Sequence, residues 1–346
     1  MPTTILLPLV NDYANAPIRK YRATGEQNTE AQAHEQMDFA LSQGINFFDV
    51  AEMYPVPPRP ETQGSTERYI GSWFKKTGNR NNVILATKVA GPADWLGHIR
   101  GGPQLTRDHI FQAVDASLDR LQTDYIDLYQ LHWPARKTNF FGQLGYQHQE
   151  EDETTPLEET LAALNELVQL GKIRHYGLSN ETAWGAMKAA NIADANGWPR
   201  PVSVQNPYNL LNRSYEVGLA EVSQREKMGL LAYSPLAFGV LTGKYLNDQQ
   251  PQNARLTLFD RFTRYTSEVA QQATREYVEL AQDLGMSAAV MAQAFVTERS
   301  FVTSNIIGAT NMLQLKENID SAQIILDDDA VAKIDAIHAR ISNPCP

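Results

Sequence analysis

Short apolar runs alternate with amphipathic segments along the chain from about residue 30 onward. The runs are rich in valine, isoleucine, leucine and aromatic residues without regular polar alternation, which is typical of strands covered on both faces. They predict strands at residues 44–50, 83–89, 125–133, 174–180, 202–208, 230–236 and 304–310.

The segments between these runs carry apolar residues at helical spacing. In one of them Leu157, Leu161 and Leu164 form a stripe, and Gly171 is expected to end the helix. Thr155-Pro156-Leu157-Glu158 predicts a capping box with proline at the first helical position. Further helices are predicted at 30–43, 66–77, 110–121, 181–196 and 214–228, with two more within 267–297.

Alternating strands and helices favour a parallel sheet with right-handed crossovers. Because no GxGxxG follows the first predicted strand, repeated units of this kind favour a (β/α)8 TIM barrel over a doubly wound sheet. We find no linker or internal repeat, so a single domain over 1–346 is the simplest organisation. Residues 134–154 are polar and lack periodicity, and we expect an inserted loop there.

A first barrel strand has to come from the segment before residue 30, and its sequence fits poorly. ILLPLV contains a proline, and IRKYRA is too charged for a barrel interior. We nevertheless expect an N-terminal segment to complete the barrel, because an open parallel edge is costly.

Composition and charge exclude several classes of partner. The net charge of −10 and the absence of a basic stripe argue against nucleic acid. Cys345 is the only cysteine, which rules out a disulfide within one chain and fits a reducing compartment. The histidines show no metal-ligand spacing, and no apolar run reaches membrane-spanning length. We therefore expect a cytoplasmic protein without a metal site or membrane association; the sequence carries no signal for an oligomeric state.

Polar side chains gather where the predicted strands end, and in a barrel these ends share one mouth. FFDVAEMY carries Asp49 and Tyr54, the next run ends at Lys88, and the third ends near His132. Each residue alone is more often structural, but their coincidence at successive strand ends favours a site. We predict that Asp49 faces Lys88, whereas Glu52 is expected to be a loop or rim charge.

These four side chains suit proton transfer to a carbonyl oxygen. A nearby ammonium favours a phenolate and lowers the pKa of a tyrosine, which would make Tyr54 a better proton donor. Asp49 would keep Lys88 charged and oriented, and His132 could donate a hydrogen bond to the carbonyl oxygen. Because such a site holds no hydride, a nicotinamide cofactor is required. A Schiff-base role for Lys88 is disfavoured, since Asp49 should keep the amine protonated.

Two glycine-containing segments bear on phosphate binding. Gly308-Ala309-Thr310 lies between a predicted strand and a helix that begins near Asn311, where backbone amides can bind an anion. Taken alone, an ordinary turn with a threonine cap would be the favoured reading. GVLTGK at 239–244 lacks both the spacing and the Ser/Thr of a P-loop, and GHIRGGP at 97–103 is expected to be a loop.

Over roughly residues 25–340 the chain resembles the aldo-keto reductases. The stretches AEMYPVPPRPETQG, LHWPARKTNFFG and QNPYNLLNRSYEVGLAE are similar to the family's bacterial Tas-like branch. The resemblance implies a (β/α)8 barrel that binds NADPH in extended form, with Asp49, Tyr54, Lys88 and His132 as the catalytic tetrad. The first 24 residues depart from the family pattern, whose first strand usually ends in a sequence like LGTMTFG.

The resemblance also assigns cofactor contacts. It implies Ser179, Asn180 and Gln205 for the nicotinamide carboxamide, Tyr233 for stacking on the ring, Ser234, Leu236, Gly239, Lys244 and Arg255 for the phosphates, and Gly308, Thr310, Gln314, Glu317 and Asn318 for the adenosine 2′-phosphate end.

Two functions follow. The first is an NADPH-dependent reductase that converts a small aldehyde or ketone to an alcohol, and the complete tetrad favours it. The alternative is an NADP(H)-binding sensor or regulatory barrel with little turnover, which the atypical N-terminus favours. Specificity is expected to reside in the 134–154 loop, the 55–66 loop, Trp95 and Trp133.

Overall fold

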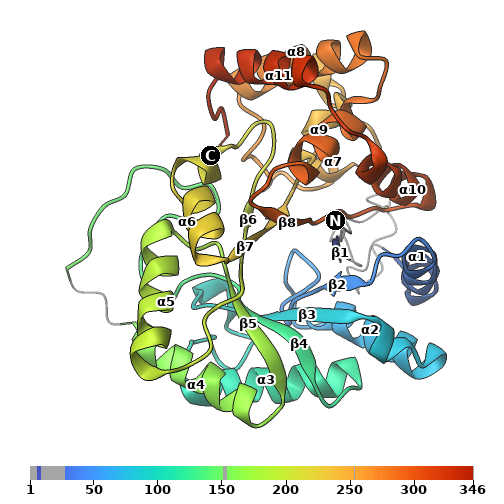
Figure 1. Ribbon diagram of the computed structural model, residues 1–346. Helices are drawn as coiled ribbons and strands as arrows, with labels where there is room; N and C mark the ends of the chain where they lie inside the picture. The colour runs from blue at the N-terminus through green and yellow to red at the C-terminus, as the bar shows by residue number, and fades with distance from the viewer. Residues whose placement is uncertain (1–5, 9–27, 151–153, 253, 346) are drawn as a thin grey trace.

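The computed structural model describes residues 6–8, 28–150, 154–252 and 254–345. Within these ranges a parallel sheet of eight strands follows the order of the chain and curls on itself, with helices along its outer side (Figure 1). The strands are β1 (Leu6–Pro8), β2 (Phe47–Asp49), β3 (Ile84–Val89), β4 (Ile126–Leu131), β5 (Ile173–Ser179), β6 (Ser203–Pro207), β7 (Gly229–Tyr233) and β8 (Val302–Asn305). The predicted parallel α/β architecture is confirmed.

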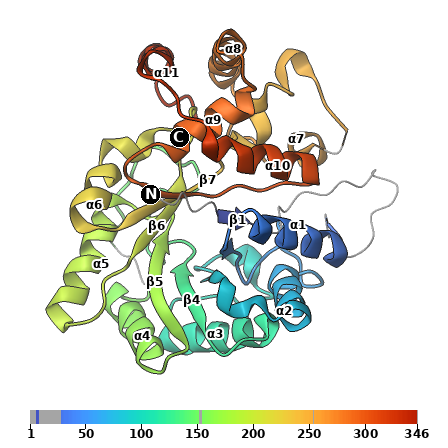
Figure 2. The ribbon, with the colours of Figure 1, turned by 45° about the vertical axis from the view of Figure 1, so that its right-hand side comes forward.

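Helices separate successive strands, and a second view shows them along the outside of the curled sheet (Figure 2). They are α1 (Glu30–Ser42), α2 (Ser65–Thr77), α3 (Arg107–Leu121), α4 (Leu157–Gln169), α5 (Ala183–Asn196), α6 (Leu219–Glu226), α7 (Arg255–Leu258), α8 (Glu268–Asp283), α9 (Ala288–Thr297), α10 (Met312–Asp320) and α11 (Asp328–Arg340). The two helices predicted within 267–297 correspond to α8 and α9.

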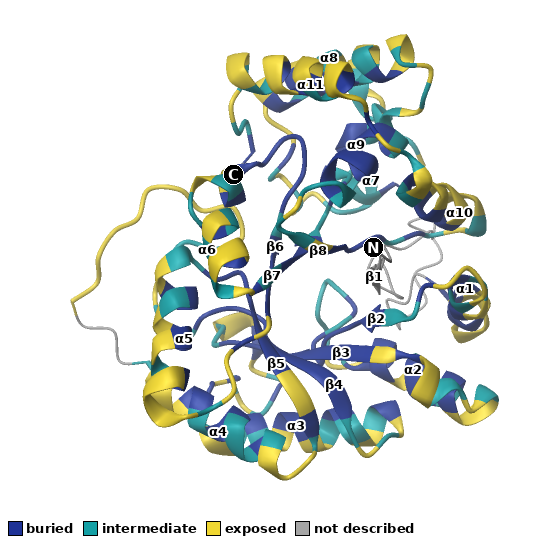
Figure 3. Ribbon diagram, in the orientation of Figure 1, coloured by how far each residue is buried: buried dark blue, intermediate teal, exposed yellow. Residues whose placement is uncertain are grey.

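Apart from a few residues near their amino ends, strands β2 to β8 are largely buried on both faces, which explains why their apolar runs do not alternate. The main core fills the space between the sheet and the surrounding helices. A smaller cluster of Ala86, Leu128, Leu231 and Ile306 lies on the other side of the strands, inside the curl. Buried residues follow the strands and exposed residues follow the outward faces of the helices (Figure 3).

The awkward N-terminal segment does supply a strand. Leu6–Pro8 pairs in parallel with β2, with Pro8 opposite Asp49. A proline is tolerated in a strand that uses only one side for pairing, and the described pairings of β1 are with β2 alone. The expectation of an N-terminal strand is confirmed for these residues, and IRKYRA lies outside the described residues.

Most predicted elements differ from the observed ones by up to three residues at an end, and two differ more in bounds or continuity. The last strand was predicted at 304–310, which is too far along the sequence, because β8 is Val302–Asn305. The apolar pair Ile306-Ile307 drew the prediction forward, while the polar residues within β8 hid its start. The predicted helix 214–228 is interrupted at Gly218, where a 3-10 turn at Ser214–Val217 gives way to α6.

The predicted capping box at Thr155–Glu158 is wrong. The N-cap of α4 is Pro156, whose ψ of 135° puts it outside the helix, and no side chain caps this end. A real capping box is formed by Thr29 and Gln32 at the start of α1. Gly171 follows α4 with a φ of +73°, in agreement with the predicted helix end.

The predicted inserted loop is confirmed for its described residues, 134–150 and 154, which contain no helix or strand. Figure 1 shows this segment as a long excursion away from the rest of the chain.

An ion pair joins the amino ends of the central strands, opposite the ends that carry the predicted site. Asp127 accepts hydrogen bonds from Arg80 Nη2 at 2.8 Å and from Arg174 Nη1 at 2.6 Å. Its carboxylate also accepts the backbone N–H of Leu85 at 3.0 Å. These contacts fix β3, β4 and β5 relative to one another.

Gly71 lets α2 approach α3 closely, because a Cβ there would lie 2.2 Å from the backbone oxygen of Arg120. We expect Gly71→Ala to lower the free energy of unfolding by about 1–3 kcal/mol, since backbone atoms have to move apart. Urea denaturation measures this change. Lys75→Ala on the exposed side of α2 is the control and should stay within about 0.5 kcal/mol of the parent; equal losses would contradict the prediction.

Candidate active site

A buried ion pair lies at the carboxyl ends of β2 and β3. Lys88 Nζ donates to Asp49 Oδ2 at 2.5 Å and to the backbone oxygen of Val50 at 2.7 Å. The Lys88 side chain is 0% exposed and that of Asp49 is 3% exposed. Because a buried ammonium needs a partner of opposite charge, each residue requires the other. The predicted contact between Asp49 and Lys88 is confirmed.

The second oxygen of Asp49 is held by two amides. Gln130 Nε2 and Gln205 Nε2 donate to Asp49 Oδ1 at 2.9 and 3.0 Å. Gln205 Nε2 also lies 3.1 Å from Gln130 Oε1, which closes a small buried network. Gln130 was not predicted as a site residue. Because side chains alternate along a strand, Gln130 lies on the same face as Leu128 and His132, which indicated that it faces the interior.

Tyr54 and His132 lie above this pair. Lys88 Nζ is 5.6 Å from the centroid of the Tyr54 ring, and the rings of Tyr54 and His132 meet edge to face at 5.6 Å. Burial, together with the charge of Lys88, holds the pKa of His132 well below its ordinary value. His132 is therefore a neutral imidazole at neutral pH, and its Nδ1 has no hydrogen-bond partner among the described residues.

A cavity of about 920 Å³ joins these side chains to the rest of the predicted site. Every residue predicted as catalytic or cofactor-binding lines it, except Lys88, which is paired with Asp49. The strand ends and the loops that follow them therefore line one continuous cavity.

The first part of the cavity wall is a hydrogen-bonded set from β5 to β7. Asn180 Nδ2 donates to the backbone oxygen of His132 at 2.8 Å, and the Tyr233 hydroxyl donates to Asn180 Oδ1 at 2.6 Å. Ser179 Oγ donates to the backbone oxygen of Gln205 at 2.8 Å. Burial raises the pKa of Tyr233 to about 12, so its hydroxyl stays protonated. These residues present amide and hydroxyl groups beside His132.

Cations gather further along the cavity. Lys244, Arg255, Arg261 and Arg264 all line it, along with Ser234, Leu236 and Gly239. Burial, helped by the charge of Arg255, lowers the pKa of Lys244. Arg264 Nη1 is buried without a partner in the described part of the chain. Such a cluster suits phosphate groups.

Sequence reasoning named Lys244 and Arg255 but missed Arg261 and Arg264. Their signal was the basic and aromatic run RFTRY, which directly precedes the late helices. Arg255 is the first residue of the short helix α7.

The far wall is the turn between β8 and α10. Gln314 Oε1 accepts the backbone N–H of Thr310 at 3.0 Å and its hydroxyl at 2.9 Å. Asn318 Nδ2 donates to the backbone oxygen of Gly308 at 3.0 Å, and Ser287 Oγ donates to Glu317 Oε1 at 2.7 Å. The helix predicted near Asn311 begins there, with Asn311 as its N-cap.

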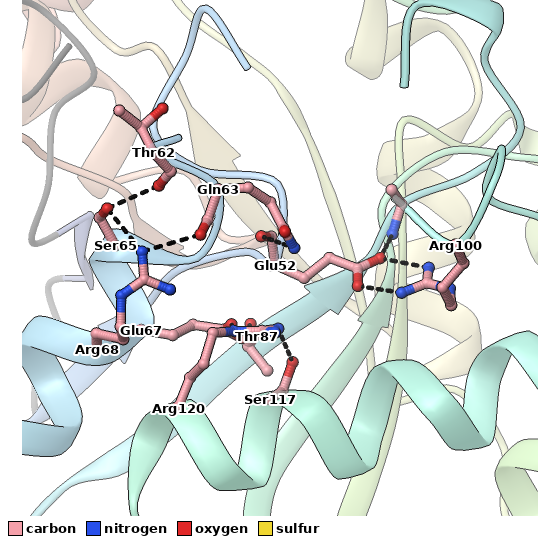
Figure 4. A network of polar contacts seen from close by, with 11 residues as sticks. Glu52, Thr62, Gln63, Ser65, Glu67, Arg68, Thr87, Arg100, Ser117 and Arg120 are labelled. Carbon is pink, nitrogen blue, oxygen red and sulfur yellow. Dashed lines mark hydrogen bonds and ion pairs between the residues drawn. The ribbon is translucent and has the colours of Figure 1, made fainter. Parts of the chain in front are cut away.

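The expectation that Glu52 is a loop or rim charge is wrong. Glu52 is 0% exposed. It accepts the backbone N–H of Ala90 at 2.7 Å and two hydrogen bonds from Arg100, at 2.5 and 2.8 Å (Figure 4). Arg100 comes from the segment 97–103, so this predicted loop supplies the partner that allows the carboxylate to be buried.

In the ranges described above, no group of three or more histidine, cysteine, aspartate or glutamate side chains is arranged to hold a metal ion. No helix built from the described residues has the length and apolar character needed to cross a membrane.

The chain is similar to known proteins over most of its length. The model of the aldo/keto reductase family matches residues 20–339. Protein tas of Escherichia coli is 54% identical over 323 residues, which are 93% of each chain. An aldo-keto reductase of Babesia bovis is 38% identical over 76% of this chain and 98% of its own. The L-glyceraldehyde 3-phosphate reductase of Escherichia coli is 33% identical over 82% of this chain and 76% of its own.

The lowered pKa of His132 makes stability depend on pH. The unfolded chain takes up a proton at His132 below about pH 6.5, whereas the folded chain does not, so stability falls as the pH falls. From pH 7.5 to 5.5 the free energy of unfolding of the parent should fall by about 1 kcal/mol more than that of His132→Gln. Urea denaturation at both pH values measures the difference.

His338→Gln is the control for this experiment, because His338 also has a lowered pKa but lies outside the cavity wall. We expect His338→Gln to reduce the pH dependence of the free energy of unfolding by less than His132→Gln does. The same pH dependence in the parent and in His132→Gln would contradict a neutral, buried His132.

Proposed function

The chain belongs to the aldo/keto reductase family, a family of oxidoreductases, and from this premise we propose that it is an NADPH-dependent reductase of aldehydes and ketones. We further propose that residues 1–346 form a single domain whose sheet closes as a (β/α)8 barrel. The observation that carries the functional proposal is the buried Asp49–Lys88 pair beneath Tyr54 and His132, at one end of a cavity lined by cations further along.

The proton needed at the carbonyl oxygen comes from Tyr54. Lys88 Nζ is 5.6 Å from the Tyr54 ring centroid, where its charge stabilises the phenolate that remains after the proton has left. Asp49 fixes the position of Lys88, because both of its oxygens are engaged. His132, neutral and adjacent to Tyr54, orients the carbonyl oxygen through an N–H.

The wall residues fit a dinucleotide with phosphate groups. The amide oxygens of Asn180 and Gln205 can accept from the N–H groups of a carboxamide, the four cations match phosphates, and the α10 turn matches the adenosine end. A reduced nicotinamide, when bound, supplies the hydride that no side chain of the site can provide. NADPH is proposed over NADH on the resemblance to the family and on the cationic wall.

The substrate end of the cavity is aromatic. Trp95, 52% exposed, stacks on Trp133 with ring centroids 5.9 Å apart, and Phe141 meets Trp133 edge to face at 5.6 Å. Together with Met53 and Val56 these rings form an apolar surface beside Tyr54 and His132. We therefore propose that the preferred carbonyl compounds carry a flat apolar group, which can lie against Trp95.

A regulatory NADP(H)-binding protein with little turnover is the second candidate. The observation that favours it is the departure of the first 24 residues from the family pattern. Tight NADPH binding without turnover on a panel of aldehydes and ketones would select it.

Tyr54→Phe tests the catalytic proposal. We expect NADPH oxidation in the presence of a nitrobenzaldehyde to fall by at least about 100-fold, because the general acid is lost. NADPH binding, measured by quenching of tryptophan fluorescence, should stay within about twofold, since the cationic wall is unchanged. Equal rates in the parent and the variant would refute the role of Tyr54.

Trp95→Ala tests the substrate class. We expect its KM for a nitrobenzaldehyde to rise by about 3- to 10-fold, which corresponds to the loss of one aromatic stacking contact, while the KM for propanal changes little. Trp184→Ala is the matched control, because Trp184 is 62% exposed on α5 and does not line the cavity. A similar rise for both aldehydes would contradict the proposed class.

A further inference from the structure

The turn that follows β2 carries Tyr54 and needs to be held in place. The Tyr54 N–H donates to the backbone oxygen of Ala51 at 3.1 Å, and the Glu52 N–H donates to that of Lys88 at 3.2 Å. These bonds define the path of residues 51–54 from Asp49 to Tyr54. The position of the Tyr54 ring over Lys88 depends on this short turn.

The side chain of Glu52 anchors this turn to the next strand and the loop after it. Its carboxylate accepts three N–H groups, one from Ala90 just after β3 and two from the guanidinium of Arg100. In Figure 4 the Glu52 side chain extends from the turn to Arg100, and the two groups meet side by side. This bidentate geometry fixes orientation as well as distance.

The loop that supplies Arg100 also supplies part of the substrate wall. Trp95, Leu96 and Ile99 precede Arg100, and the two buried residues of these three pack in one apolar cluster with Met53 and Trp133. Arg100 itself has a φ of +50°, in the left-handed region. The ion pair therefore joins the loop of the proton donor to the loop of Trp95.

The turn is also held from the α2 side. Gln63 Nε2 donates to the backbone oxygen of Glu52 at 3.3 Å, and the Gly64 N–H donates to that of Tyr54 at 2.9 Å. Residues 52–54 are thus fixed between the start of α2 and the Arg100 loop. Removing Arg100 would release one of these two supports.

Stability alone does not account for this ion pair. Burial disfavours the charge of Arg100, yet the hydrogen bonds and charge of Glu52 outweigh it and keep the pKa of Arg100 above its ordinary value. A well-packed apolar pair is often as stable as a buried ion pair, but it lacks the directional bonds that define one arrangement. Only the charged pair provides directional hydrogen bonds, and these bonds fix the orientation of the turn.

We propose that Glu52 and Arg100 are positioning residues that hold Tyr54 over Lys88 and fix it relative to the Trp95 loop. The proposal rests on the proposed function for its kinetic consequence, but the predicted order of the Tyr54 ring is independent of turnover. Neither residue lines the cavity, so both act through Tyr54 and its neighbours.

The test compares Arg100→Met with Arg80→Met. The two arginines are matched, with side chains 12% and 13% exposed and a carboxylate partner each, but Arg80 pairs with Asp127 at the opposite ends of the strands. We expect Arg100→Met to lower kcat for a nitrobenzaldehyde by about 10- to 100-fold, since small misplacements of a reacting group are this costly. The Kd of NADPH should stay within about twofold.

Arg80→Met should lower the melting temperature while retaining kcat. Arg100→Lys keeps the charge but not the bidentate fork, and it should recover part of the lost kcat. A parental kcat in Arg100→Met, or an equal loss of kcat in Arg80→Met at the same folded fraction, would overturn the proposal.

A second measurement does not depend on catalysis. With 3-fluorotyrosine at position 54, the parent and Arg80→Met should give one narrow ¹⁹F resonance, and Arg100→Met a broadened or shifted one. An unchanged resonance in Arg100→Met would overturn the positioning role even if the parent shows no turnover. Absence of turnover in the parent, with the expected resonances, would instead refute the proposed function alone.

Discussion

The charge of Lys88 in a fully buried position is the constraint on which the rest of the site depends. A buried ammonium is tolerated only beside a carboxylate, and the parallel pairing of β2 with β3 brings Asp49 to it at 2.5 Å. Gln130 and Gln205 then occupy the other oxygen of Asp49. Two further strands, β4 and β6, thereby help to hold one lysine, and the mouth of the sheet gains a fixed positive charge beneath Tyr54.

The cavity separates two kinds of chemistry along its length. The groups proposed for proton transfer and the aromatic rings lie where β2 and β4 end, whereas the cations come from the segment between β7 and α8. The rigid strand ends fix the reacting groups to within the precision of hydrogen bonds. The cationic wall is built from the longer segments after β7, so one sheet carries both the strand-end site and this wall.

Much of this arrangement was predictable, because it depends on local pattern. The apolar runs give the strands, and the order of Asp49, Lys88 and His132 at their ends gives the site. The role of Glu52 was not predictable, because its partner lies 48 residues away in a loop without periodicity. The start of β8 was missed because its residues Thr303 and Ser304 are polar, although the strand pairs with β7. Pairing between distant side chains decides such positions, and a sequence pattern does not record it.

The side-chain amide of Gln205 donates to Asp49, and the same residue also lines the cavity. A ligand that accepted this N–H would remove one hydrogen bond from Asp49, the carboxylate that balances the charge of Lys88. Coupling free energies between two sites are reciprocal. A ligand that competed for this N–H would change the charge balance of the Asp49–Lys88 pair, and by reciprocity a change in that balance would change the affinity for that ligand.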